Sequence, residues 1–254
     1  MLEGFLPPDT TEIYSPFFGG GAFEIYCAAN KNIRVVACDK FKPLANFWQC
    51  FLKNKQRVID GIQKLLPMSK ESFVNNKTVY HKLKSKYAQA AMYFAINRVS
   101  FNGVMQKYSH VRAMRSSDFV LKKLAKFNVN NINVKHQDYI EFLSELPEFK
   151  NGMLLFLDPP YRLKEFYYGW RGEMHRGFDH VDLAARLLAI TDTFPWILCY
   201  NDCAEIRQLY NNCAIYTVSW VHSMSFSNNK QENRLQNNTE IVILSHKLNA
   251  TLMH

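Results

Sequence analysis

Short apolar runs separated by polar and glycine-rich punctuation divide the chain into strand-like and helix-like segments. Two runs near the start, Glu12 to Phe17 and Ile33 to Cys38, are predicted strands because apolar, β-branched and aromatic residues dominate them. Five further runs with strand character follow after residue 126, and they are Asn131 to His136, Met153 to Leu157, Trp196 to Tyr200, Ile215 to Val221 and Glu240 to Leu244. Strands that alternate with helices predict an α/β fold built on seven strands.

Helical spacing of apolar residues marks the segments between those strands. The predicted helices are Phe23 to Ala29, Phe41 to Leu52, Val58 to Leu66, Tyr80 to Val99, Tyr139 to Leu146, Val181 to Thr193 and Glu205 to Tyr210. Polar stretches predict two longer loops, Gln106 to Arg115 and the Asn-rich segment Ser223 to Asn238. Because the pattern from about residue 57 to 126 is helical throughout, we expect a helical insertion over 57–126 within a domain made of 1–56 and 127–254.

Composition limits the classes of protein to consider. The chain has 254 residues, 48% of them hydrophobic, which suffices for a large core. Its six cysteines form no Cys-x-x-Cys pair, so we expect neither a metal site nor a disulfide framework. The start lacks the pattern of a signal peptide, and no apolar run is long enough to span a bilayer. We therefore expect a soluble, intracellular protein, with the compartment left open.

The positive charge is concentrated in one part of the chain. The formal net charge is +9, and residues 77–126 alone contain eight lysines and three arginines but a single acid, Asp118. A block of this kind indicates a module that faces a polyanion such as nucleic acid. A basic face that serves only solubility is the alternative.

Several side chains in or beside the polar loop Gln106 to Arg115 suit contacts with DNA. Guanidinium, ammonium and amide groups grip phosphates and read base edges, and an aromatic ring can stack on a base. The candidates are Arg98, Asn102, Lys107, Tyr108, Arg112, Arg115, Lys122 and Lys123. An ordinary surface loop remains the alternative.

Asp158-Pro159-Pro160-Tyr161 directly follows the apolar run Met153 to Leu157. Two consecutive prolines donate no backbone hydrogen bonds, so they predict a stiff turn at the carboxyl end of a buried strand, the edge at which α/β sheets bind ligands. A carboxylate and an outward carbonyl can each accept one hydrogen of an exocyclic amine and leave its lone pair free to attack. Tyr161 can stack on a base swung out of its duplex. An ordinary turn with a surface tyrosine is the alternative.

A second set of residues suits a nucleoside-containing cofactor. Gly19, Gly20 and Gly21 lie between a predicted strand and a predicted helix, where glycine permits close approach of a ligand to the backbone. Asp39 ends the second strand about 20 residues later, a position typical of an acid that binds ribose hydroxyls. A role for Asp39 as the N-cap of the next helix is compatible with this one.

The ordered motifs resemble a known family. YSPFFGGGAF and VVACDK come first, a basic helical stretch follows, and NVKHQDY and LLFLDPPY come last. Over nearly the whole chain this order is similar to the Dam-type DNA adenine methyltransferases, including phage and chlorella-virus members. The resemblance implies a Rossmann-like fold with a seven-stranded mixed sheet, S-adenosylmethionine as cofactor, double-stranded DNA as partner and the insertion as target-recognition domain.

The resemblance also implies roles for individual residues. Cofactor contacts are implied at Phe18, Gly19 and Gly21, ribose contacts at Asp39 and an adenine-ring contact at Asp138. Catalysis is implied at Asp158, Pro159 and Tyr161, with Asp158 also beside the cofactor. No metal is implied.

The sequence differs from the family pattern near the start of the chain. Members usually carry a Gly-x-Lys element whose lysine and neighbouring aromatic hold the methionine end of the cofactor, and residues Met1 to Tyr14 contain no lysine. We therefore expect weak cofactor binding by this chain alone, unless Arg98, Lys107, a protein partner or a second subunit supplies the contact.

Three functions remain open from the sequence. The first is transfer of a methyl group to adenine in duplex DNA, which Asp158 at the head of the turn and the basic insertion favour. The second is methylation of RNA or protein on the same fold, and the third is nucleic-acid binding without catalysis.

Overall fold

The computed structural model describes residues 2–114, 117–162, 169–174, 176–219 and 239–253. By its internal contacts the chain forms two compact units. One comprises residues 11–147 and 165–178 and is called here the glycine-turn unit. The other comprises residues 1–10, 148–164 and 179–254 and is called the Pro-Pro unit, after Asp158-Pro159-Pro160-Tyr161.

The strands follow the order β3-β2-β1-β4-β5-β7-β6 in a seven-stranded sheet. Their bounds are β1 Glu12–Ser15, β2 Arg34–Asp39, β3 Ile132–His136, β4 Met153–Leu157, β5 Trp196–Asn201, β6 Ala214–Ser219 and β7 Thr239–Leu244. The pairs β1–β2, β2–β3 and β4–β5 are parallel, whereas β7 runs antiparallel to both β5 and β6. The predicted α/β fold with a seven-stranded mixed sheet is confirmed.

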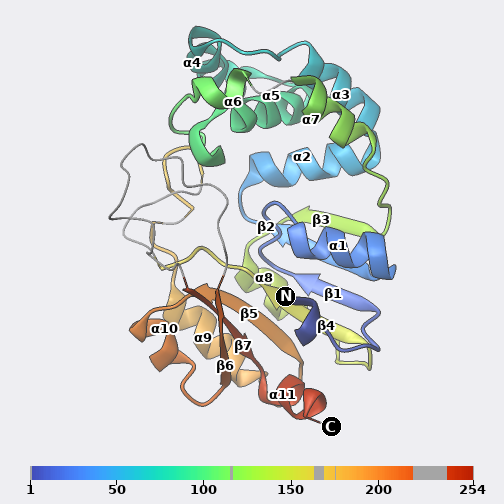
Figure 1. Ribbon diagram of the computed structural model, residues 1–254, viewed down its shortest axis with the longest axis vertical. Helices are drawn as coiled ribbons and strands as arrows, with labels where there is room; N and C mark the ends of the chain where they lie inside the picture. The colour runs from blue at the N-terminus through green and yellow to red at the C-terminus, as the bar shows by residue number, and fades with distance from the viewer. Residues whose placement is uncertain (1, 115–116, 163–168, 175, 220–238, 254) are drawn as a thin grey trace. The chain divides into compact units, whose positions relative to one another are not determined.

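The glycine-turn unit combines strands β1 to β3 with most of the helices. Its helices are α1 Ala22–Lys31, α2 Lys42–Lys53, α3 Lys55–Gln63, α4 Lys70–Val79, α5 Lys86–Val99, α6 His110–Met114, α7 Ser117–Ala125 and α8 Tyr139–Ser144, with short 3-10 helices η2 Tyr80–Lys82 and η3 Phe101–Gly103. Within this unit, α2 lies between the strands and the group α3 to α7 (Figure 1). Helices α3 to α7 are therefore connected to the strands of this unit through α2.

Stacked aromatic rings form the contact between α2 and α5. The ring of Phe47 lies 5.4 Å from Phe51 and 5.1 Å from Phe94, with interplanar angles of 15° and 21°. Tyr93 of α5 and Phe47 are both buried. Burial of rings this large is a major source of stability, so these contacts hold α5 against α2.

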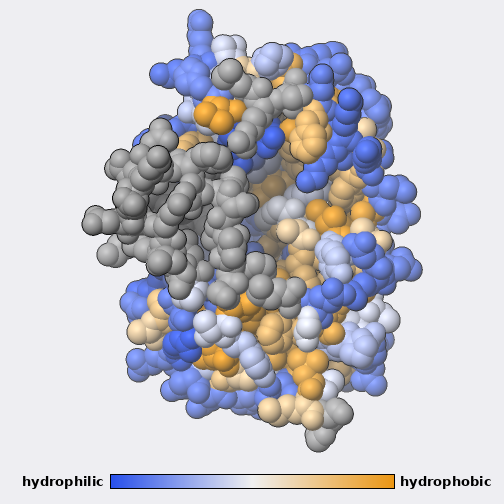
Figure 2. All heavy atoms as spheres, viewed as in Figure 1, coloured by the Kyte–Doolittle hydropathy of each residue, from blue (hydrophilic) through white to orange (hydrophobic). Residues whose placement is uncertain are grey.

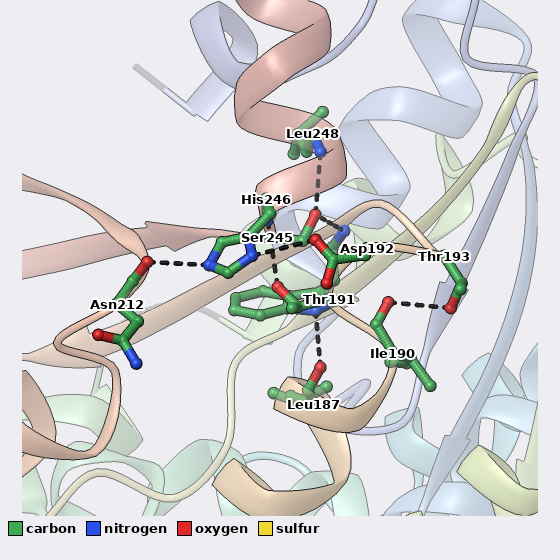
Figure 3. Close-up of polar contacts among 10 residues, drawn as sticks. Leu187, Ile190, Thr191, Asp192, Thr193, Asn212, Ser245, His246 and Leu248 are labelled. Carbon is green, nitrogen blue, oxygen red and sulfur yellow. Dashed lines mark hydrogen bonds and ion pairs between the residues drawn. The ribbon is translucent and has the colours of Figure 1, made fainter.

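The Pro-Pro unit contains β4 to β7 together with η1 Leu2–Phe5, α9 His180–Ala189, α10 Ala204–Leu209 and α11 His246–Leu252. A polar network joins α11 to the turn after α9 (Figure 3). Nδ1 of His246 lies 3.1 Å from Oδ1 of Asp192, and its Nε2 lies 2.9 Å from the carbonyl oxygen of Asn212. Oγ of the buried Ser245 accepts hydrogen bonds from the amides of Trp196 and Leu248. These bonds fix the start of β5 and of α11 together.

Two predictions of secondary structure were wrong. The expected helix Tyr80 to Val99 is interrupted, because Ser85 caps a new helix through the amide of Ala88 at 3.3 Å. The expected loop Gln106 to Arg115 contains α6, whose first turn is supported by Oγ of Ser109 accepting from the amide of Arg112.

The other predicted elements are present, with ends that differ by up to four residues. Helices α4, α7 and α11 were missed. The predicted loop Ser223 to Asn238 lies outside the described residues. The end of the predicted strand at Val221 lies outside them as well. No helix in the described ranges has the length and apolar character needed to cross a membrane.

Candidate active site

The Pro-Pro turn projects from the carboxyl end of β4. Leu154 to Leu157 are buried, as expected for a strand covered on both faces. Asp158 is exposed, and Pro159 after it is buried. The next residue after Tyr161 is tied to β5, since the amide of Arg162 donates to Oδ1 of Asn201 at 2.9 Å and Nδ2 of Asn201 donates back to the carbonyl of Arg162 at 3.2 Å. The turn is thus held at both ends.

Asp158 has an unusual electrostatic environment. Desolvation by the surrounding protein and the nearby carboxylate of Glu240 raise its pKa to about 7, while a hydrogen bond with the side chain of Tyr161 opposes the shift. Solvent still reaches the Asp158 side chain, so water offsets part of that desolvation. A carboxyl group with a pKa near neutrality can accept and release a proton under physiological conditions.

Tyr161 rests against a buried hydrogen-bonded pair. Its ring centroid lies 6.2 Å from that of Tyr200 on β5, and the hydroxyl group of Tyr200 lies 2.8 Å from Nδ1 of His180 on α9. Tyr200 and His180 are buried, which restricts the positions open to Tyr161. The sequence did not reveal these two supporting residues, because a strand tyrosine and a helix-terminal histidine read as ordinary core.

In the glycine-turn unit, the backbone of Phe18 holds the glycine turn through two hydrogen bonds. The amide of Phe18 donates to the carbonyl of Cys38 at 3.0 Å, and that of Gly21 donates to the carbonyl of Phe18 at 2.7 Å. Gly21 has φ +64, and a Cβ there would lie 2.5 Å from the Phe18 ring, so glycine is required. The Phe18 side chain is buried, which leaves the main chain of the turn for contacts with a ligand.

Asp39 joins the end of β2 to this turn. One carboxylate oxygen accepts from the amide of Gly19 at 2.9 Å, and the other accepts from the amide of Phe41 at 2.7 Å. Burial raises the pKa of Asp39, and the two amides and His136 work against that rise. Phe41, not Asp39, occupies the N-cap position of α2. The alternative role of Asp39 as that N-cap was therefore wrong.

Asp138 follows the end of β3, next to the end of β2 that carries Asp39. Asp39 is the register partner of His136, and the amide of Gln137 donates to the carbonyl of Asp39 at 3.3 Å. Asp138 caps α8 by accepting from the amide of Ile140 at 3.0 Å, and its carboxylate pairs with Lys40 at 2.6 Å. The structure therefore gathers Gly19, Asp39 and Asp138 in one unit.

The acceptor capacity of these residues fits a ligand with hydroxyl and amine groups. A carboxylate offers about four lone-pair sites. Each carboxylate oxygen of Asp39 accepts one backbone N–H, which leaves further lone-pair sites for a ligand hydroxyl group. A Cβ built on Gly20 would meet no atom within 4 Å, so that part of the turn is open. Among the described residues, no group of His, Cys, Asp or Glu could hold a metal ion.

The candidate DNA contacts in the helical insertion fall into two groups. Lys107, Lys122 and Lys123 are exposed and available to an anionic partner. Tyr108 donates to the carbonyl of Met68 at 2.8 Å and Arg112 donates to the carbonyl of Ser100 at 3.1 Å, so both stabilise the insertion internally.

The remaining candidates are less exposed or less defined. Arg98 on α5 is half-buried, Asn102 lies in η3, and Arg115 lies outside the described residues. The surface over α3 and α7 is mostly hydrophilic (Figure 2).

One protein family matches the chain. Residues 2–224 fit the model of a family described as D12 class N6 adenine-specific DNA methyltransferase. No curated protein matches the chain.

Proposed function

Because the chain belongs to the D12 class N6 adenine-specific DNA methyltransferases, we propose that it transfers a methyl group from S-adenosylmethionine to the N6 amine of adenine in duplex DNA after swinging the base out of the helix. The observation that carries this proposal is the Pro-Pro turn. Asp158, with its pKa raised to about 7, heads a turn fixed to β4 and β5 and has Tyr161 as a hydrogen-bond partner.

Asp158 and Pro159 act on the amine. The lone pair of an adenine amine is delocalised into the ring, which makes it a poor nucleophile. When the Asp158 carboxylate and the Pro159 carbonyl each accept one N–H of the amine, the lone pair is directed away from the ring plane. After the amine has been methylated, one of its protons leaves, and the Asp158 carboxylate is suited to accept it.

Tyr161 holds the base. Its ring, supported by Tyr200, provides a flat surface for a base outside the duplex. Stacking of a base on an aromatic side chain contributes roughly 1–3 kcal/mol. The turn therefore combines base binding with activation of the amine.

The glycine-turn unit contains the residues proposed to bind the cofactor. The ribose hydroxyls would bind Asp39, the adenine ring would lie beside Asp138, and the backbone at Gly19 to Gly21 would face the remainder of the molecule. S-adenosylmethionine supplies an electrophilic methyl group on a sulfonium ion. The chain's contribution is to orient that group and to exclude water from it.

The helical insertion is proposed to bind the DNA backbone. Lys107, Lys122 and Lys123 are exposed, and the basic stretch 77–126 has few acids to neutralise it. We propose 57–126 as the target-recognition domain, within a catalytic domain of 1–56 and 127–254.

Transfer of tritium-labelled methyl groups tests this function. The purified chain is incubated with labelled S-adenosylmethionine and, separately, with duplex DNA, RNA and a protein extract. The expected result is label in DNA, lost in Asp158→Ala and reduced in Tyr161→Ala, with both variants folded. Label in RNA or protein but not DNA would identify a different methyltransferase, and wild-type activity in folded Asp158→Ala would refute the catalytic assignment.

A further inference from the structure

Residues 169–174 and 176–178, called here the aromatic strap, belong to the glycine-turn unit although they follow the Pro-Pro turn in sequence. The two ends of the strap carry large aromatic side chains, Trp170 and Phe178. Each of these rings packs on a residue one or two positions in sequence from a proposed cofactor contact. That arrangement connects the strap with cofactor binding.

Trp170 packs on Phe41 and on the inserted helices. Its ring centroid lies 6.2 Å from Phe41, 4.9 Å from Tyr80 and 5.8 Å from His81. The Phe41 ring also lies 5.9 Å from that of the buried Tyr93. The amide of Phe41 donates to Asp39, so the residue beneath Trp170 holds one of the two Asp39 oxygens.

Phe178 packs on Phe17 and Tyr139, which lie beside the glycine turn and beside Asp138 in the sequence. Its ring lies 5.6 Å from Phe17, edge-on, and 5.4 Å from Tyr139. Phe17 and Tyr139 are themselves in contact at 5.3 Å. Phe17 directly precedes Phe18 and the glycine turn, and Tyr139 directly follows Asp138. Phe178 therefore fixes the segments that carry Gly19 and Asp138.

The start of the strap is stabilised by its own hydrogen bonds. The Glu173 carboxylate accepts from the amides of Trp170 at 2.8 Å and Arg171 at 2.7 Å. Gly169 has φ +91, and a Cβ there would lie 2.6 Å from Cδ of Glu173, so glycine is required for this turn. The turn fixes the backbone direction at Trp170 before its side chain packs.

We propose that the aromatic strap holds the cofactor-binding residues of the glycine-turn unit in position, with Trp170 acting through Phe41 on Asp39 and Phe178 acting through Phe17 and Tyr139 on Gly19 and Asp138. Trp170 and Phe178 are positioning residues in this inference, which rests on the proposed use of S-adenosylmethionine. Truncation of either ring frees the residue beneath it, so the hydrogen-bonding groups must be ordered again when the ligand binds.

Calorimetry and steady-state kinetics on matched variants test the strap. Trp170→Ala and Phe178→Ala are compared with Trp170→Phe, which keeps a ring, and with Tyr26→Ala, which removes an exposed aromatic side chain from α1. Ligands are S-adenosylmethionine and its demethylated product. The expected result is a rise of about tenfold in Kd and KM for the cofactor in both alanine variants. Trp170→Phe should recover most of the affinity, and KM for DNA should stay within about twofold of wild type.

Three outcomes would overturn the inference. Unchanged cofactor affinity in both alanine variants, beside a wild type that binds normally, would refute the strap but leave the proposed function intact. A rise in KM for DNA alone would assign the strap to DNA binding. A wild type that binds no cofactor would refute the proposed function and the strap with it. If Trp170→Ala does not fold, Trp170→Leu, which keeps apolar bulk without a ring, takes its place. Unchanged cofactor affinity in both Trp170→Leu and Phe178→Ala would then refute the inference.

Discussion

At the scale of single residues, Asp158 is expected to give methyl transfer a pH dependence. Its pKa is raised to about 7 by desolvation and by Glu240, and only the ionised carboxylate accepts hydrogens from the amine without donating one. We expect kcat/KM to rise with pH through about 7 and then level off. Glu240→Gln removes the repelling charge, so its profile should have a lower midpoint than the wild-type profile.

A rate assay across pH 5.5 to 9 checks this expectation, with kcat/KM measured for wild type and Glu240→Gln in buffers of equal ionic strength. A flat wild-type profile, or the same midpoint in both proteins, would contradict the role given to the Asp158 carboxylate.

The same raised pKa predicts that Asp158 reduces stability at alkaline pH. The unfolded-state pKa of an aspartate is about 3.9, so between that value and about 7 the folded state binds more protons than the unfolded state. The free energy of unfolding therefore falls as pH rises through this window. Asp158→Asn cannot ionise and should melt at a higher temperature than wild type at pH 8, while losing activity.

Thermal melts at pH 4 and pH 8 measure this difference. Each kcal/mol gained should raise the melting temperature by about 2–4 °C for a chain of this size. The gain should be present at pH 8 and small at pH 4. An Asp158→Asn protein that melts below wild type at pH 8 would contradict the prediction.

At the scale of elements, the link between the Pro-Pro turn and β5 is expected to control the rate of transfer. Asn201 makes two hydrogen bonds with the backbone of Arg162, directly after Tyr161. Loss of this link lets the turn shift, and small misplacements of reacting groups cost up to about a hundredfold in rate. We expect Asn201→Ala to lower kcat about tenfold and to leave cofactor Kd unchanged.

Single-turnover kinetics measure this effect. Asn30→Ala, which removes an exposed side-chain hydrogen bond within α1, is the control and should behave as wild type. A normal kcat in Asn201→Ala would show that the turn is rigid without the link.

The positive charge of residues 77–126 leads us to expect salt-dependent binding of DNA. If about five cations contact phosphates, the logarithm of the binding constant should fall against log salt with a slope of roughly −4 to −5. Exchange of the exposed Lys107, Lys122 and Lys123 for glutamine should reduce the steepness of that slope by roughly 2 to 3.

Fluorescence anisotropy with a DNA duplex at several salt concentrations gives these slopes. The charge-matched control exchanges Lys31, Lys135 and Lys150, which are exposed and lie outside the basic stretch. Equal slopes for the two triple variants would favour the alternative of a basic face that serves only solubility.

Individual elements differ in how well the sequence predicts them. The strand Met153 to Leu157 was identified to the residue, because a five-residue apolar run closed by two prolines has few other conformations. Helix α4 was missed because its apolar face is short, and Phe73 is its one buried residue. The support of Tyr161 by Tyr200 and His180 depends on contacts distant in sequence, which no local pattern encodes.

At the scale of the whole molecule, the order of the motifs was more informative than any one of them. A glycine turn, an acid after a strand and an Asp-Pro-Pro-Tyr turn are each common, but their order along the chain predicted the family that residues 2–224 match. The strap was not predicted, because Trp170 and Phe178 follow no motif and acquire meaning only through their packing on Phe41, Phe17 and Tyr139.

Nucleoside analysis of methylated DNA tests the central claim most directly. Unmethylated duplex DNA is incubated with the purified chain and S-adenosylmethionine, digested to nucleosides and separated by chromatography with mass detection. The expected product is N6-methyldeoxyadenosine, present with wild type and absent with Asp158→Ala. Methylated cytosine in place of methylated adenine, or N6-methyldeoxyadenosine formed equally by the Asp158→Ala protein, would contradict the account.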